Sequence, residues 1–193
     1  AIITVVTFVQ GFGTYMTNML RGYGTQYMVV RPDIRWEAEM LGIGQVQLTM
    51  DDVNAVRLDC ENVRRLTPFV FVETTVSYGR SSVQQIPTRG VTQEYQAIRN
   101  YFVDCGRFFG PLDVESAAHV CVVGRSLLTR LDADESILGE CIQIVDQRFR
   151  VVGILEGKGS FFGDDQDLTV MIPHTTMLQM FPEQRTLIRF LAE

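Results

Sequence analysis

The sequence predicts an α+β domain, and three observations support this prediction. About seven or eight strand-like segments are interleaved with four or five short helices, without the regular strand–helix alternation of a doubly wound sheet. Of the 193 residues, 46% are hydrophobic, which excludes a disordered or collagen-like chain. A chain of this length can bury a core without disulfides or a metal. We therefore expect one domain or two small intertwined subdomains.

The N-terminal segment is predicted to be helical. Between Val5 and Leu20 the apolar residues recur at steps of three and four, which marks one face of a helix, and Gly22 and Gly24 end it. The apolar run Ala1–Val9 is far shorter than the roughly 18 residues of a membrane span. It is either the tail of a longer span or a buried terminal helix or edge strand.

A strand and a short helix follow. Gln26–Arg31 is predicted to be a strand, and the proline after it closes the strand because proline cannot donate to a ladder. A polar, glycine-bearing loop comes next. Thr49, with Asp52 three residues later, resembles a capping box, so Met50–Asp59 should be a short helix.

The middle of the chain is predicted to alternate between strands and helices. Phe69–Tyr78 and Val83–Val91 show partial alternation around the turn-like Gly79–Ser82, which indicates two antiparallel strands. Gln93–Arg99 is predicted to be a helix. His119–Val123 is a continuous apolar strand that ends at a glycine.

The C-terminal third begins with a helix, Arg125–Leu131. Cys141–Val145 and Phe149–Leu155 are predicted to form a hairpin that turns at Asp146-Gln147. A glycine-rich loop is predicted at Gly157–Asp167, followed by a strand at Leu168–Ile172 that Pro173 stops. A helix at Thr175–Phe181 and a last strand at Thr186–Leu191 complete the chain.

The net charge of −6 bears on possible partners. Because the basic residues are scattered and the overall field would repel a polyanion, we expect no nucleic-acid partner.

The segment from Gly153 to Ser160 superficially resembles a phosphate-binding loop. A P-loop has four residues between its glycines and a Ser or Thr directly after the lysine; here three residues separate Gly153 from Gly157, and Gly159 follows Lys158. We therefore expect no nucleotide and no other cofactor to bind to this chain.

No metal site or catalytic cluster is predicted. The acidic residues Asp164, Asp165 and Asp167 lack the glycine and the glutamate of an EF-hand loop, so we expect a solvated acidic loop. The two histidines, His119 and His174, lie in different elements, and neither a GxSxG nor an HExxH motif is present. We expect no enzyme activity and no catalytic residues.

The four cysteines are too far apart for a CxxC metal or redox motif. They are Cys60, Cys105, Cys121 and Cys141. Cys121 and Cys141 each lie in an apolar run, which favours buried thiols that pack as small hydrophobic groups. Their disulfide state stays open, since four cysteines permit three connectivities.

Six motifs, taken in order and spacing, resemble the MacB-type periplasmic core domain of ABC transporter permeases, in the superfamily of MacB, FtsX and LolC-LolE. The motifs are Gly90–Tyr95, Asp104–Phe109, His119–Gly124, Ile137–Ile144, Phe149–Gly153 and Val170–Pro173. Each is weak alone, but the six occur in register over about 85 residues. The resemblance extends backward to Leu20–Val30, and it identifies Ala1–Gly13 as similar to the end of a first transmembrane helix.

The resemblance implies a domain on the periplasmic side of a bacterial inner membrane, between the first two transmembrane helices of the permease. Residues 1–21 would form the end of the first helix and its extracytoplasmic extension. Residues 22–85 and 150–193 would form a porter-like lobe, and residues 86–149 a smaller Sabre-like lobe. The implied partners are a separate ABC ATPase domain or subunit, a second permease copy, the membrane and a possible periplasmic adaptor protein. The implied role is mechanotransmission during export.

Two alternatives stay open. One is a docking domain of an FtsX-like permease that regulates cell-wall hydrolases, and the other is a free-standing binding module or enzyme. Phe161 and Phe162, flanked by glycines and acidic residues, either pack back onto the domain or contact a partner or membrane surface.

Overall fold

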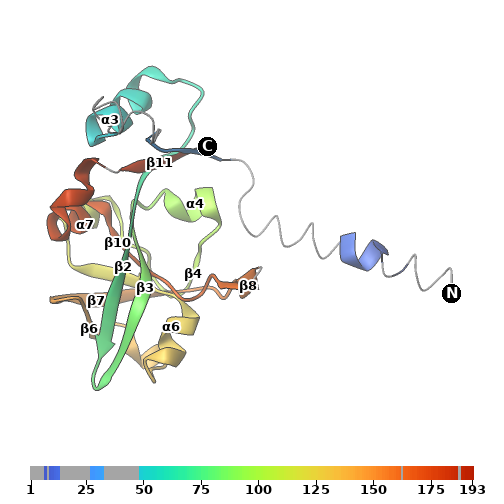
Figure 1. Cartoon of the computed structure of the whole chain (residues 1–193), viewed down its shortest axis with the longest axis vertical. Helices are drawn as coiled ribbons and strands as arrows, with labels where there is room; N and C mark the ends of the chain where they lie inside the picture. The colour runs from blue at the N-terminus through green and yellow to red at the C-terminus, as the bar shows by residue number, and fades with distance from the viewer. Residues whose placement is uncertain (1–6, 8, 14–26, 33–47, 162, 187) are drawn as a thin grey trace, which may run out of the picture.

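The structure is a computed structural model that describes residues 7, 9–13, 27–32, 48–161, 163–186 and 188–193. It is a mixed α/β fold with one large sheet, which agrees with the predicted α+β class. Thr7 and residues 9–13 are helical, as predicted for this segment (Figure 1). The rest of that predicted helix, and the polar loop before Leu48, lie outside the described residues. Within the described residues, no helix is both long and apolar enough to cross a membrane.

Six strands of the sheet pair in a closed ring. In order around the ring they are β2 (Leu66–Tyr78), β3 (Ser81–Val91), β10 (Val170–Pro173), β5 (Val120–Val123), β7 (Gln147–Leu155) and β6 (Cys141–Ile144). The β6–β2 pairing, Val76 opposite Ile144, closes the ring. The β3–β10 and β5–β7 pairs are parallel and the other four are antiparallel.

Three further strands extend the ring at its edges. β11 (Arg189–Ala192) pairs with the start of β2, and β1 (Met28–Val30) pairs with β11. β4 (Val103–Gly106) pairs with the end of β7. The predicted strand at Gln26–Arg31 is confirmed as the shorter β1.

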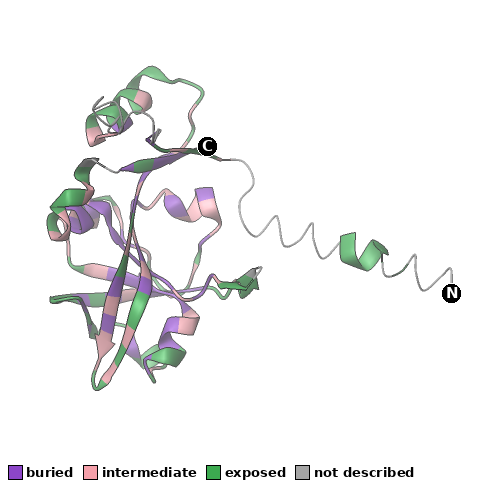
Figure 2. Cartoon of the chain, viewed as in Figure 1, coloured by how far each residue is buried: buried purple, intermediate pink, exposed green. Residues whose placement is uncertain are grey.

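One hydrophobic core draws residues from all six strands of the ring. The alternation in β6 shows how: Ile142 and Ile144 are buried whereas Gln143 is exposed, so every second side chain points inward. Phe149 and Val151 of β7 continue this layer and are fully buried. Along the β2–β3 hairpin, buried residues alternate in part with intermediate and exposed ones (Figure 2).

A second core lies on the outer face of the ring. Val122, Met171 and Leu155 point there from β5, β10 and β7. They pack with Tyr95 and Ile98 of α4 (Tyr95–Arg99) and with Val114 of α5 (Pro111–Glu115). The two short helices therefore cover apolar sheet surface that would otherwise face water.

The remaining helices flank the sheet. They are α3 (Met50–Asp59), α6 (Arg125–Arg130) and α7 (His174–Met180), with 3-10 turns at Glu135–Ile137 and Pro182–Thr186. The predicted helix at Met50–Asp59 is confirmed, and Asp52 accepts a hydrogen bond from the backbone N–H of Thr49 at 2.7 Å, as in a capping box.

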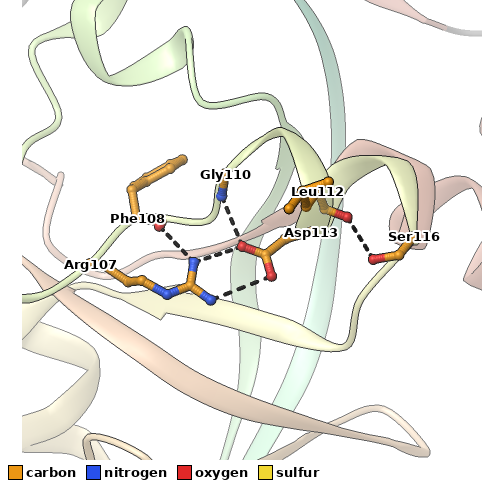
Figure 3. Close-up of polar contacts among 6 residues, drawn as sticks. All are labelled: Arg107, Phe108, Gly110, Leu112, Asp113 and Ser116. Atoms are coloured by element: carbon orange, nitrogen blue, oxygen red, sulfur yellow. Dashed lines mark hydrogen bonds and ion pairs between the residues drawn. The ribbon is translucent and has the colours of Figure 1, made fainter.

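The sequence did not predict α5. A compact cluster of polar contacts stabilises this helix (Figure 3). The Asp113 carboxylate accepts hydrogen bonds from the backbone N–H of Gly110 (2.9 Å) and from the Arg107 guanidinium (2.6 Å). Ser116 bonds back to the Leu112 carbonyl (2.7 Å) at the other end. The missed signal was a proline at the first helical position with an aspartate two residues later.

Several predicted boundaries and one predicted loop differ from the structure, and the last strand begins at Arg189 and not at Thr186, which ends a 3-10 turn. The β6–β7 hairpin turns at Val145-Asp146, one residue earlier than expected, and Val145 adopts a positive φ of 54°. Pro173 was expected to follow the strand, but it is the last residue of β10 and lies opposite Val91. At this position the missing N–H of proline breaks no further hydrogen bond of the ladder. The glycine-rich loop 157–167 is not wholly irregular, since β8 (Ser160–Phe161) and β9 (Asp164–Asp165) pair within it.

The predicted division into two lobes has both of its boundaries inside continuous strands. One falls between residues 85 and 86 of β3, and the other between residues 149 and 150 of β7. The division stays a prediction.

Candidate functional site

The junction of the two chain ends is the first candidate site. β1 and β11 lie side by side in antiparallel register, with Met28 opposite Ala192 and Val30 opposite Phe190. β11 in turn pairs with the start of β2. Both ends of the described domain therefore connect, through adjacent strands, to the same long strand of the sheet.

Side chains reinforce this junction. Tyr27, directly before β1, accepts a hydrogen bond from the Arg99 guanidinium, whose central carbon lies 4.9 Å from the centre of the tyrosine ring. Arg65 forms a salt bridge to Glu193 at 2.9 Å. The backbone N–H groups of Arg64 and Arg65 also donate to the Glu193 carbonyl. These contacts tie the chain ends to α4 and to the start of β2.

Lys158 lies beside this junction and connects it to the loop after β7. Its Nζ donates to the carbonyl of Arg99 at 2.7 Å and lies 3.8 Å from the centre of the Tyr101 ring. Burial, followed by the nearby charges of Arg99 and Arg89, lowers the pKa of Lys158 to about 8. The amine therefore serves as a contact to α4 and Tyr101.

The sequence suggested a solvated acidic loop, but the loop is not uniformly solvated. Asp164 is exposed, but Asp167 is buried, and its carboxylate accepts hydrogen bonds from the backbone N–H groups of Lys158 (2.7 Å) and Gly159 (2.9 Å). A carboxylate of the chain thus occupies the amides that a phosphate would need in this glycine-lysine loop. No phosphate-binding geometry is formed at Lys158.

The β8–β9 hairpin carries the two phenylalanines singled out above. Phe161 is the last residue of β8 and its backbone pairs with Asp164. Phe162 lies outside the described residues. In Figure 1 the hairpin projects from the body of the domain. The choice between packing and partner contact stays a prediction.

The four cysteines are free thiols. Cys121 is fully buried, as predicted, whereas Cys141 is exposed because it sits at an outward-facing position at the start of β6. Burial raises the pKa of Cys121 well above its usual range. Cys60 is exposed, and Cys105 is half-buried.

One group of possible metal ligands is present among the described residues. Asp104, Cys105 and Glu135 bring their ligand atoms within 4.8 Å of one another. Arg125 forms ion pairs with both carboxylates, at 3.2 Å from Glu135. The guanidinium therefore already neutralises the two acids, and the group resembles an ion-pair network more than a cation site.

The two histidines do not come together. His119 packs edge-on against Phe149, with ring centres 5.1 Å apart. His174 is buried at the start of α7 and lines a cleft between α3, α5 and the β3–α4 connection. Sequence reasoning missed this cleft, because its walls come from segments more than 100 residues apart.

Residues 1–192 match the MacB-like periplasmic core domain. The chain belongs to this family. The match covers nearly the whole chain and confirms the resemblance found in the six motifs.

The chain is also similar to curated MacB proteins. The chain is 28% identical over 177 residues to "Macrolide export ATP-binding/permease protein MacB" of Shewanella sp. (strain W3-18-1), covering 92% of this chain and 27% of that protein. It is 26% identical to the MacB of Vibrio parahaemolyticus serotype O3:K6, covering 97% and 28%. The chain thus spans about a quarter of the length of these relatives.

Solved structures share the fold. The periplasmic region of MacB from Actinobacillus actinomycetemcomitans superposes with a TM-score of 0.73 at 20% identity, covering 90% of this chain and 77% of that one. The extracellular domain of the noncanonic ABC-type transporter YknZ from Gram-positive bacteria gives a TM-score of 0.68 at 17% identity, covering 86% and 83%.

Proposed function

We propose that this chain is the extracytoplasmic domain of an ABC transporter permease in a bacterial inner membrane, and that it couples ATP hydrolysis to export. The ATPase would be a separate domain or subunit. The observation that carries the proposal is the pairing of β1 with β11, which brings both chain ends to β2. The MacB relatives, described as macrolide export ATP-binding/permease proteins, support the transporter class.

The junction is suited to transmitting force. A displacement of the segment before β1 would act on β11 and β2 through backbone hydrogen bonds, and on α4 through Tyr27 and Arg99. Backbone ladders resist shear because each residue shift would break several hydrogen bonds together. A pull on either chain end would therefore move the domain as a body.

The N-terminal helix would supply the lever. Val9 and Phe12 are 61% and 56% exposed, so the helix carries apolar surface that a membrane or a partner helix could cover. In this proposal residues 1–21 end the first transmembrane helix and extend it toward the domain, which would consist of a porter-like lobe at 22–85 with 150–193 and a smaller Sabre-like lobe at 86–149. A second permease copy and a periplasmic adaptor would complete the assembly.

The test is a flexible insertion in the full-length permease. Six Gly/Ser residues after Gly22 would replace the stiff lever by random coil. We expect export to be lost, while the domain still folds and the permease still assembles with its ATPase. The matched control is the same insertion in the exposed turn at Gly79-Arg80, which should leave export intact. Export near the wild-type level after the Gly22 insertion would show that the domain only docks partners.

The regulatory alternative predicts a different gene neighbourhood. A membrane-fusion adaptor encoded beside the permease supports export, whereas a cell-wall hydrolase or its activator supports regulation. The shared fold with the extracellular domain of YknZ does not separate the two, because fold alone does not define function.

A further inference from the structure

Arg99, the last residue of α4, contacts two segments that are far apart in sequence. Its guanidinium donates a hydrogen bond to the hydroxyl of Tyr27, directly before β1, and its central carbon lies 4.9 Å from the centre of that ring. Its backbone carbonyl accepts a hydrogen bond from Lys158 Nζ at 2.7 Å. Because the carbonyls in the last turn of a helix have no partner within the helix, Lys158 satisfies a group that α4 leaves open. Arg99 therefore connects the segment before β1 with the loop after β7.

Lys158 is bonded both to α4 and to the far end of its own loop. Its amine lies 3.8 Å from the centre of the Tyr101 ring, which is the geometry of a cation–π contact. Its backbone N–H donates to the buried carboxylate of Asp167 at 2.7 Å. A shift of α4 would therefore act on the loop through the side chain and the backbone of a single residue.

The β8–β9 hairpin begins two residues after Lys158 and is very small. Its paired strands, Ser160–Phe161 and Asp164–Asp165, have two residues each. An isolated two-stranded hairpin is at best marginally stable in water, so the order of this one depends on the contacts at its base. There the Gln166 N–H donates to the Gly159 carbonyl at 3.2 Å.

A separate contact supports the same base from α6. The Ser126 hydroxyl donates to Asp165 Oδ1 at 3.0 Å. This hydrogen bond involves neither Arg99 nor Lys158. It therefore stabilises the hairpin without a link to the segment before β1.

We propose that Lys158 is a positioning residue that makes the order of the β8–β9 hairpin depend on the position of the segment before β1. The path runs from Tyr27 through Arg99 and Lys158 to the base of the hairpin. The hairpin is the element with two states, ordered and open, and its opening breaks only a few polar contacts. A displacement of Tyr27 shifts the equilibrium toward the open state because it moves Arg99 away from Lys158.

This inference deepens the proposed function and rests on it for its consequence. A movement of the N-terminal lever would change the surface that the hairpin offers to a partner. The test uses the 193-residue chain and involves no transport. Loss of the coupling and loss of the lever function are therefore observed separately.

The experiment measures hydrogen exchange of the Gln166 amide by NMR, because this amide reports the opening of the hairpin base. Tyr27→Phe removes the hydroxyl that accepts from Arg99, and Lys158→Met keeps the aliphatic stem but removes the amine. We expect each change to accelerate the exchange by about threefold or more. In the Lys158→Met background, Tyr27→Phe should have no further effect, since the path is already broken.

Ser126→Ala is the matched control. It removes the contact to Asp165, so it should also accelerate the exchange of the Gln166 amide. Ser126 and Tyr27 share no partner on the proposed path, so the accelerations caused by Ser126→Ala and Tyr27→Phe should multiply in the double variant. This behaviour differs from that expected when Tyr27→Phe is combined with Lys158→Met.

The amide of Val151 separates local opening from general destabilisation. Val151 is fully buried in β7 and donates to the Glu140 carbonyl at 2.9 Å, so its exchange should not change in any variant. Equal acceleration at Val151 and Gln166 would overturn the proposal. Unchanged exchange of Gln166 after Tyr27→Phe, or independent effects of Tyr27→Phe and Lys158→Met, would overturn it as well.

Discussion

The Asp167 carboxylate bridges the backbone N–H groups of Lys158 and Gly159, at 2.7 and 2.9 Å. Asp167 is only 8% exposed, and these two bonds account for the charge that it buries. The backbone N–H groups of this glycine-lysine loop are therefore bonded to a carboxylate of the same loop. These two bonds fix the position of the loop between β7 and β8.

The first prediction is that the chain does not bind ATP. Its glycine-lysine loop has the wrong spacing, its amides are occupied by Asp167, and the Lys158 amine bonds the Arg99 carbonyl. Calorimetric titration with Mg-ATP should show no micromolar binding. Such binding, if it were lost on Lys158→Ala, would contradict the prediction.

The second prediction concerns the β8–β9 hairpin. Because this hairpin projects from the domain in Figure 1, we expect the double change Phe161→Ser and Phe162→Ser to leave the unfolding temperature within about 1 °C, while assembly with a partner or membrane is weakened. The measurement is thermal unfolding followed by circular dichroism.

The control for the hairpin is Phe109→Ser. Phe109 is 1% exposed in the outer core, and its loss should lower the unfolding temperature by several degrees. A similar fall in the hairpin variant would assign Phe161 and Phe162 to packing, and the contact hypothesis would fail.

The third prediction is that thiol reactivity follows burial. Cys60 and Cys141 are exposed and should react with a maleimide in the folded chain, whereas Cys121 should react only after unfolding. Cys121 and Cys141 lie on strands at opposite edges of β7, about 10 Å apart at the usual strand spacing, which is too far for a disulfide. Mass spectrometry after labelling measures both points, and a Cys121–Cys141 crosslink under oxidising conditions would refute the pairing of the strands.

The sequence predicted local elements well and long-range ones poorly. The helix at Met50–Asp59 was predicted from its capping box, and the β2–β3 hairpin was predicted from its turn. Both patterns involve only a few neighbouring residues. The closure of the ring by β6 on β2 joins residues almost 70 positions apart, and no local pattern encodes it. β4, with the sequence Val-Asp-Cys-Gly, is too short for its alternation to indicate a strand, and it forms one because β7 pairs with it.

The candidate sites were harder to predict for the same reason. Phe161 and Phe162 were identifiable because aromatic residues stand out between glycines and acids. His174 was visible as a residue, but the cleft that it lines together with Arg57 depends on how α7 and α3 are placed in the fold. Tyr27 and Arg99 are likewise separated by 72 positions in sequence.

The last prediction is a pH-dependent contribution of Asp113 to stability. The hydrogen bond from Arg107, more than the one from the Gly110 amide, holds the pKa of Asp113 below its ordinary value of 3.8. Because the folded pKa is lowered, the carboxylate stabilises the fold at pH values above about 3.8, and this contribution is lost as the pH falls through the lowered pKa. Asp113→Asn should therefore lower the unfolding temperature at pH 7 and have less effect near pH 3, because below pH 3.8 the carboxyl group of the unfolded chain is protonated and the stabilising contribution of the charge falls. Asp51→Asn, at an exposed position of α3, is the matched control and should change the unfolding temperature little at either pH. An equal destabilisation by Asp113→Asn at pH 7 and pH 3 would mean that the side chain acts through packing at the start of α5 and not through its charge.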